Sequence, residues 1–302
     1  QHMYGMELSV LMPLLAPAQS STLKDSLQKA LLLSREDTAR VDLLNELGMQ
    51  VENNSPEEAK YYYRQAGVLS EKLGYKMGRL KYYSNYTAAL NMQARYDSGL
   101  LLNQQALALA ERYALPDRIG VAQHNMAASY TYLEDYENAL AWHLKSLPYF
   151  EGIKDEGRLS IIYDNIGIVY RELKLYEKAL EFHGKALAIA RKNKSDFDIA
   201  IVLSNMGIAY TSLKKYEEAL TVLRESLATG RTLQDDYLLK NVLVNMGNVY
   251  IKRGAYDSLP GCSTEGLAVA RRVGDSLSMT SNLYALGLYH FYQKDFVRSM
   301  EL

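Results

Sequence analysis

Apolar residues recur every three or four positions through most of this chain, a spacing that gathers them on one face of an α-helix. The pattern predicts one helix over 198–213 and a second over 216–233, with polar turns at 193–196 and 234–236. A further helix is predicted over 22–33, where the apolar residues that share a face are Leu23, Leu27, Ala30 and Leu31. The chain is therefore expected to be all-α, with helices paired through short turns.

The helical pattern has a period of forty residues. Asparagine returns at this interval at six positions, the ladder asparagines: Asn45, Asn85, Asn125, Asn165, Asn205 and Asn245. Two residues later the repeat favours a small residue, as in Thr87, Ala127, Gly167, Gly207, Gly247 and Gly287. Small residues at fixed positions allow two helix backbones to approach closely. One structural unit is therefore copied and stacked along the chain.

The period places a capping helix at 21–35 before the repeat array of 36–302. The expected units are 36–75, 76–115, 116–155, 156–195, 196–235, 236–275 and a truncated 276–302. In the sixth unit the sequence Leu259-Pro260 predicts a second helix that begins late or bends, with Ser258 as its N-cap. The chain stops after the opening of a second helix at 296–302, so we expect a further segment to follow.

This repeat resembles the tetratricopeptide repeat, most clearly in Asn165-Ile-Gly-Ile-Val-Tyr170 followed by Tyr176 and Ala179. The usual tetratricopeptide unit has about 34 residues, so a forty-residue unit predicts that both helices are longer by most of a turn. The resemblance covers roughly residues 36–302. It implies a right-handed α-solenoid of antiparallel helix pairs, in which the first helix of each pair lines a concave groove.

Two different lines of residues run along the first helix of the unit at 156–195. The apolar line suited to packing consists of Ile162, Ile166, Val169, Tyr170 and Leu173. A second line consists of Ile161, Asn165, Ile168 and Glu172, and the resemblance implies that this line faces the groove. The line and its counterparts in the other units are called the groove line below.

In the family that the chain resembles, groove asparagines commonly hydrogen-bond the backbone of an extended peptide. An asparagine amide suits this role because it offers two donors and an acceptor. The alternative is that the ladder asparagines solvate the concave face or bond a neighbouring helix. The candidate groove residues are Asn85, Asn125, Asn165, Asn205, Asn245, Lys81, Val121, His124, Ile161, Ile168, Ile201, Ile208, Asn241, Asn248 and Lys252.

Some chaperone-associated tetratricopeptide domains hold the C-terminal carboxylate of a partner with cations and asparagines from three units. Lys81, Asn85 and Asn125 match the first places of that arrangement, but Ile161 and Asn165 stand where its last cations belong. A carboxylate would lose two of its charged partners. The sequence therefore favours an internal or apolar peptide segment as ligand.

Composition argues against several other functions. The 34 Lys and Arg residues balance 35 Asp and Glu residues, for a net charge of −1, so a nucleic-acid partner is not expected. The single Cys262 excludes an internal disulfide and a cysteine-based zinc site. We find no metal-ligand spacing, phosphate loop, cofactor motif or catalytic constellation. His143 and His183, forty residues apart, are expected to pack in the core.

The N-terminus carries a short apolar run, Leu8 to Ala18, that resembles the late half of a secretory signal peptide. Gln1–Met3 resembles a cloning remnant. The alternative to a signal peptide is that the apolar run is an amphipathic leader that packs on the first repeat. An extracytoplasmic location follows if 8–18 is a signal remnant, and a cytoplasmic one otherwise. No run reaches the roughly 20 apolar residues that span a membrane.

The sequence thus predicts a non-catalytic scaffold that binds a peptide or protein segment in its groove. The stretch Asp37 to Asn45, with Ser55 to Ala59, resembles the tetratricopeptide sensor regions of Bacteroidetes-type histidine kinases and transcriptional regulators. That resemblance implies a sensor or regulatory region of a larger signalling protein. The alternatives are a self-associating array that stacks through its open C-terminal end, and the regulatory part of an enzyme whose active site lies outside this chain.

Overall fold

The computed structural model describes residues 17–52 and 54–301, in which all regular structure is helical. The expected signal remnant up to residue 16 and the cloning remnant lie outside these residues. The helices are α1 (Pro17–Leu33), α2 (Thr38–Val51), α3 (Pro56–Lys72), α4 (Lys76–Asn91), α5 (Tyr96–Arg112), α6 (Pro116–Tyr132), α7 (Tyr136–Gly152), α8 (Glu156–Glu172), α9 (Tyr176–Lys192), α10 (Asp196–Ser212), α11 (Tyr216–Leu233), α12 (Asp236–Arg253), η1 (Tyr256–Ser258), α13 (Leu259–Val273), α14 (Ser276–Tyr292) and α15 (Phe296–Glu301). The predicted helices at 22–33, 198–213 and 216–233 correspond to α1, α10 and α11.

Helix length explains the forty-residue period. Helices α5 to α10 each contain 17 residues, and three-residue turns join them. Two such helices with their turns account for forty residues. The two helices therefore share the additional length over a 34-residue unit, which amounts to most of a turn in each.

The turn between helices repeats its backbone conformation every twenty residues. From the turn after α3 onward, one residue in each turn is left-handed: Gly74, Ala94, Ala114, Glu134, Lys154, Lys174, Lys194, Lys214, Gln234, Gly254, Gly274 and Lys294. In the turn after α8, the backbone N–H groups of Lys174 and Leu175 donate to the carbonyls of Arg171 and Tyr170 at 2.9 and 2.8 Å. These bonds satisfy carbonyls that the end of a helix leaves unpaired.

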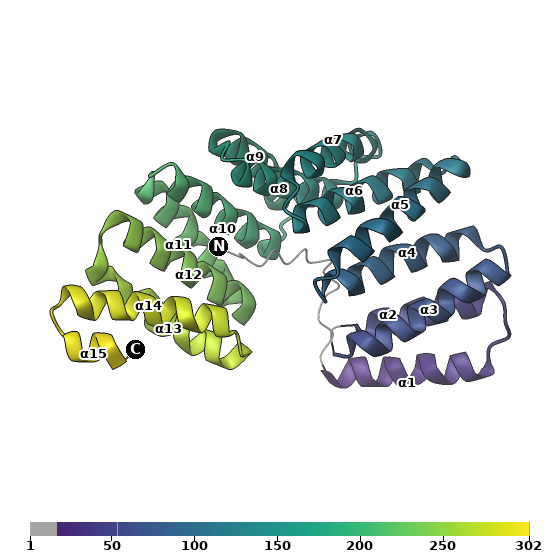
Figure 1. Cartoon of the computed structure of the whole chain (residues 1–302), viewed down its shortest axis with the longest axis horizontal. Coiled ribbons are helices and arrows are strands. Elements are labelled where there is room, and N and C mark those ends of the chain that lie inside the picture. Colours follow the sequence, from purple (N-terminus) through teal and green to yellow (C-terminus); the bar gives the residue numbers. More distant parts are fainter. Residues whose placement is uncertain (1–16, 53, 302) are drawn as a thin grey trace. The chain divides into compact units, whose positions relative to one another are not determined.

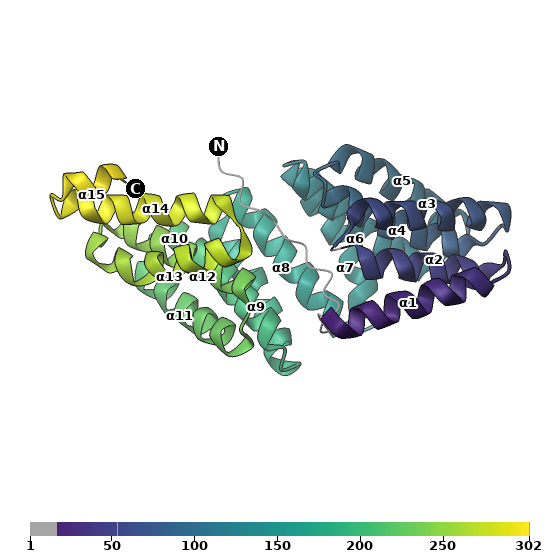
Figure 2. The same ribbon diagram turned by 90° about the horizontal axis from the view of Figure 1, so that it is seen from below.

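The described residues form two compact units, one ending at Gly152 and the other beginning at Ile153, and the two units are described separately. In the first unit, α2, α4 and α6 lie side by side and each packs against the following helix of its own pair (Figure 1). Its core includes Val41, Leu44, Tyr63 and Leu80, all buried. The antiparallel pairing of these helices is also visible from below in Figure 2.

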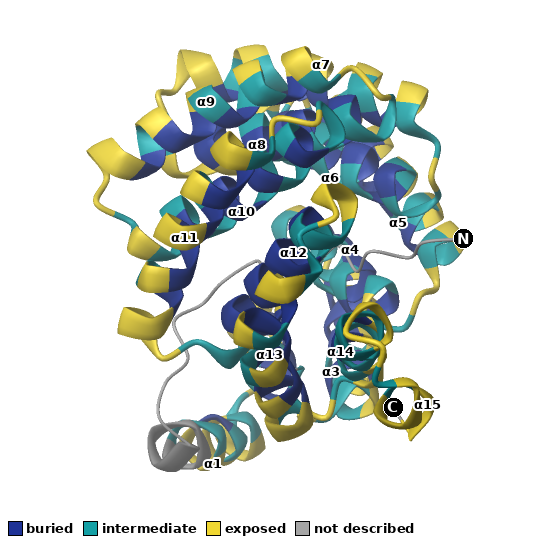
Figure 3. Ribbon diagram, turned by 90° about the vertical axis from the view of Figure 1, so that its left-hand side faces the viewer, coloured by how far each residue is buried: buried dark blue, intermediate teal, exposed yellow. Residues whose placement is uncertain are grey.

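In the second unit, α8, α10, α12 and α14 are the neighbouring first helices, and α9, α11 and α13 are their partners. Leu203, Leu223, Leu243 and Val249 are among its fully buried core residues. Figure 3 shows buried residues on the packed faces of the helices and exposed residues at their turns. The fold is the all-α arrangement of repeated helix pairs that the sequence predicts.

The sixth repeat begins its second helix late, as Pro260 predicted. A short 3₁₀ turn at Tyr256–Ser258 precedes α13, and Pro260 lies in the first turn of α13. The prediction that Ser258 caps this helix is wrong, since its side chain makes no capping hydrogen bond. Its backbone has φ −86° and ψ −10°, whereas an N-cap residue needs an extended backbone to direct its side chain at the helix N-terminus.

Candidate functional site

The groove line is accessible to solvent in the repeat formed by α10 and α11. Ile201, Asn205 and Ile208 of α10 are each half-buried, while Val202 and Leu203 on the opposite side of the helix are buried. The helical spacing places these two sets on different faces, because residues four and seven apart lie on one side of a helix. The line expected to face a groove is therefore the accessible one in α10.

Among the candidate groove residues, Asn245 is buried and the others are at least partly accessible to solvent. Ile161, Asn241 and Lys252 are exposed, and Asn245 is buried. The remaining candidates are half-buried: Lys81, Asn85, Val121, His124, Asn125, Asn165, Ile168, Ile201, Asn205, Ile208 and Asn248. Each compact unit thus presents a line of amide and apolar side chains along its first helices.

Two ladder asparagines of the first unit bond the preceding first helix, whereas Asn45 donates to the carbonyl of Val41 in its own helix. The side-chain nitrogen of Asn125 donates to the hydroxyl of Ser84 at 3.2 Å, and that of Asn85 donates to the side-chain oxygen of Asn45 at 3.3 Å. These contacts are called ladder bonds below. They correspond to the alternative in which the repeated asparagine bonds a neighbouring helix.

Two of the three ladder asparagines of the second unit also form ladder bonds, whereas the buried side-chain nitrogen of Asn165 has no hydrogen-bond partner among the described residues. The side-chain nitrogen of Asn205 donates to the Asp164 carboxylate at 2.9 Å, and that of Asn245 donates to the Ser204 hydroxyl at 3.1 Å. In three of the four bonds the acceptor lies one residue before the preceding ladder asparagine. One amide N–H is thereby used inside the protein, and the second N–H and the amide oxygen are left for other contacts.

A buried Asp–His pair, which the sequence did not predict, supports one ladder bond. Asp164 Oδ1 lies 2.6 Å from Nδ1 of His183, and Asp164 Oδ2 accepts the ladder bond from Asn205. His183 is completely buried, as the core-packing prediction required, and Asp164 is 7% exposed. The sequence signal for the pair is that Asp164 stands where Ser84 and Ser204 stand in other repeats.

His124 packs against the second helix of its own repeat. Its ring centroid lies 5.5 Å from that of His143 and 6.4 Å from that of Phe150, both of which are buried residues of α7. Burial, with a smaller effect from the neighbouring His124, lowers the pKa of His143 well below its ordinary value. The ring of His124 thus takes part in the packing of α6 on α7.

Charges along the groove line are mostly paired within the protein. Lys81 Nζ lies 2.7 Å from Asp42, and Glu172 lies 2.6 Å from Arg171. Lys252 has no carboxylate within ion-pair distance among the described residues of its unit. The charge of Lys81 is thus paired with an acidic residue of the preceding first helix.

Within residues 17–52 and 54–301, no group of three His, Cys, Asp or Glu side chains could hold a metal ion. In the same residues, no helix has the length and apolar character needed to cross a lipid bilayer.

Comparison with known protein families identifies the repeat. Residues 118–192 and residues 199–234 match two family models described as the tetratricopeptide repeat. No curated protein matches the sequence.

Several solved structures share the fold. The apo form of the quorum sensor NprR from B. thuringiensis has a TM-score of 0.67 and 16% identity, with 94% of this chain and 91% of that chain covered. NprR in complex with its cognate peptide NprX has a TM-score of 0.65 and 21% identity, covering 94% and 83%. A signal-transduction ATPase with a tetratricopeptide repeat sensor from Pyrococcus horikoshii has a TM-score of 0.62 and 17% identity, covering 92% and 40%. At these identities the likeness establishes the fold.

Proposed function

We propose that this chain, which is built of tetratricopeptide repeats, is a non-catalytic scaffold that binds an extended peptide or protein segment along its groove line. The observation that carries the proposal is the accessible line of amides and isoleucines on neighbouring first helices. Packed helices lie about 8–10 Å apart, and an extended chain advances about 3.3 Å per residue. Successive helices would therefore meet about every third residue of the ligand.

The ladder bonds prepare the asparagines for this role. In Asn125 and Asn205, one N–H is held by the preceding helix, which fixes the direction of the amide. The free N–H and the oxygen then suit a backbone carbonyl and a backbone N–H of the ligand. Because the protein fixes the amides beforehand, less conformational entropy is lost on binding. This mode of recognition does not depend on the ligand's side chains.

Selectivity would come from the side chains between the amides. In the second unit these are Ile161, Ile168, Ile201 and Ile208, which offer apolar contacts to a ligand. Lys81 already pairs with Asp42, so it is poorly placed to bind a free carboxylate as well. The groove line therefore favours an internal segment with apolar side chains.

We further propose that the scaffold is the sensor or regulatory region of a larger signalling protein. Two of the similar structures support this context by their descriptions, because NprR is a quorum sensor crystallised with a cognate peptide and the archaeal ATPase carries a repeat sensor. A peptide that binds along several repeats would stabilise the array, since any ligand selective for the folded state does so.

The proposal is tested by selecting peptides from a phage-displayed library of random linear peptides and measuring their affinity by fluorescence anisotropy. Ile161→Lys places a charge on the groove line and should weaken binding about tenfold or more, equivalent to about 1.4 kcal/mol. Leu233→Lys is the matched control, since Leu233 and Ile161 are each 39% exposed and Leu233 lies outside the groove line. Failure to select any binding peptide, or equal losses in both variants, would contradict the proposal.

A further inference from the structure

The row of ladder bonds ends in the second unit at α14. Ala285 occupies the place forty residues after Asn245, and Val244 occupies the place forty residues after Ser204. Asn245 and Ser204 form a ladder bond between α10 and α12, but the alanine and valine side chains have no hydrogen-bonding group. The contact between α12 and α14 therefore lacks the amide that fills the corresponding space between α10 and α12.

A second change removes side-chain volume from the same place. In the fifth repeat, a Cβ added to Gly207 would lie 2.6 Å from Leu223, so the leucine fills the space beside that glycine. In the sixth repeat, a Cβ added to Gly247 would lie 3.8 Å from its nearest neighbour, the hydroxyl of Ser263. Ser263 stands forty residues after Leu223, and the shorter side chain leaves the space beside Gly247 open.

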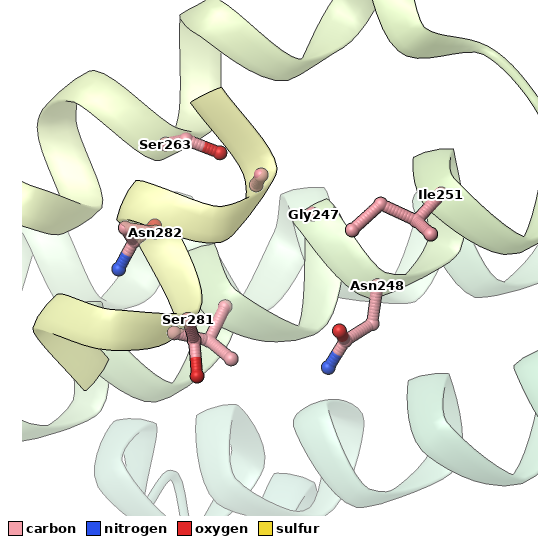
Figure 4. A pocket seen from close by; sticks show the side chains of 8 residues that line it. Gly247, Asn248, Ile251, Ser263, Ser281 and Asn282 are labelled. Atoms are coloured by element: carbon pink, nitrogen blue, oxygen red, sulfur yellow. The ribbon is translucent and has the colours of Figure 1, made fainter. Parts of the chain in front are cut away.

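The two changes together open a recess between α12, α13 and α14. Its enclosed volume is about 10 Å³, which is room for about one group of the size of a water molecule, such as a methyl or a hydroxyl. Val244, Ile251 and Ala285 provide an apolar lining, and Asn248 and Ser281 provide polar groups. In Figure 4, the side chains of Asn248 and Ser281 extend from α12 and α14 to the same side. The other lining residues are Gly247, Ser263 and Asn282, so none of the lining residues carries a charge.

The recess adjoins the groove line. Asn248 is a groove-line residue of α12, and Ser281 holds the equivalent place on α14 to Asn241 of α12. The hydroxyl of Ser281 donates to the carbonyl of Leu277 in its own helix, and a hydroxyl oxygen can still accept a hydrogen bond. An extended segment that lies along the groove line would pass the mouth of the recess and could insert one of its side chains into the recess.

We propose that this recess is a specificity pocket that accepts one small uncharged side chain of the bound segment, of the alanine or serine class. The inference rests on the proposed function, because it needs a segment in the groove. A larger side chain exceeds the narrow space beside Gly247, and a charged one finds no opposite charge in the lining. The recess thus supplies the side-chain selection that the ladder asparagines lack.

The test uses the peptides selected on the whole chain from the random library. Their sequences should share one position that is restricted to small uncharged residues, and replacing that residue by leucine or glutamate should weaken binding about tenfold or more. Ser263→Leu should cause a comparable loss with the original peptide, since it restores the leucine that fills the corresponding place in the fifth repeat. Thr264→Leu, at the exposed neighbouring residue, is the control and should leave the affinity unchanged.

The outcomes separate this inference from the proposed function. If peptides bind and Ile161→Lys weakens them, but no position is restricted and Ser263→Leu has no effect, the pocket is overturned and the groove stands. If no peptide binds the wild-type chain, both are overturned. Circular dichroism confirms that Ser263→Leu remains folded, and Gly247→Ala, for which the backbone has room, is a second variant that should reduce binding.

Discussion

The two compact units share one repeat but fill the same core position differently. In the first unit, the second helices place Tyr63, Asn103 and His143 opposite the first helices, whereas in the second unit Leu223 follows His183. Asn103 donates to two partners through its nitrogen, while its buried oxygen has none. The first unit therefore buries polar groups with incomplete pairing at this position, and in the second unit Nε2 of His183 also has no partner among the residues that the structure describes.

The buried ionisable groups of the two units also differ in how they are paired. In the first unit, burial raises the pKa of Glu52 to about 7 and outweighs the hydrogen bond from Tyr63, and burial lowers the pKa of His143. In the second unit the corresponding histidine, His183, is paired with Asp164. The comparison teaches that one repeat can tolerate polar core residues either by pairing them or by keeping them uncharged.

The largest expected effect comes from breaking the pair in the second unit. Asp164→Ala leaves the ring of His183 and the amide of Asn205 without their partner. It should lower the free energy of unfolding by about 3 kcal/mol, measured by urea denaturation followed by circular dichroism.

The double variant Asp164→Ser with His183→Leu is the control. It reproduces the combination of Ser204 and Leu223 that the following repeat already contains. Its stability should lie close to that of the wild type, because serine can accept the ladder bond and leucine needs no polar partner. A double variant as unstable as Asp164→Ala would show that the pair does more than satisfy the hydrogen-bonding groups of its two members.

The next effect concerns pH and the first unit. The carboxyl of Glu52 has an ordinary pKa of 4.5 in the unfolded chain and about 7 in the folded protein. Its ionisation therefore opposes folding, and its contribution to stability falls as the pH rises from about 4.5 to about 7. Glu52→Gln should remove this fall and stabilise the protein at pH 8 by about 2 kcal/mol or less.

Thermal unfolding of the two proteins between pH 4 and pH 8 measures this difference. The paired histidine of the second unit is unaffected by the substitution, so the change should be confined to probes in the first unit, such as hydrogen exchange of α2 and α3. Identical pH profiles for wild type and Glu52→Gln would contradict the comparison between the units.

The smallest effect comes from the turns, which both units share. Lys194 is left-handed, with φ 54°, a conformation that costs a residue with a Cβ about 1 kcal/mol or more. Lys194→Gly should stabilise the chain by about 0.5 kcal/mol after the higher chain entropy of glycine is subtracted. Ala188→Gly, at an exposed site inside α9, should instead destabilise it by about 1 kcal/mol.

Much of the fold could be predicted from the sequence because the same pattern of residues recurs in every repeat. The forty-residue spacing predicted the paired helices, and Pro260 predicted the late start of α13. The left-handed turn residues escaped prediction because lysine, alanine and glutamate occupy most of them and carry no glycine signal. The failed Ser258 cap had a similar origin, since residue type alone does not give the backbone conformation that a cap requires.

The candidate site could be predicted only in part. Helical spacing identified which residues are accessible, but it did not reveal that Asn125 and Asn205 already bond the preceding helix. Such bonds join residues about one repeat apart, and their acceptors vary between serine and aspartate. The recess beside Gly247 was also hidden, because it results from what is missing in two separate segments, at Ser263 and Ala285.

The most direct test of the groove is methyl NMR of the isoleucines of the second unit during titration with a library-selected peptide. Ile161, Ile168, Ile201 and Ile208 lie on the accessible groove line, whereas Ile162 and Ile166 are buried on the packing face. Binding along the groove line predicts shifts of the first four methyl signals that saturate together, with smaller shifts for the buried two. Saturable binding that leaves the four groove-line signals unchanged would contradict the account.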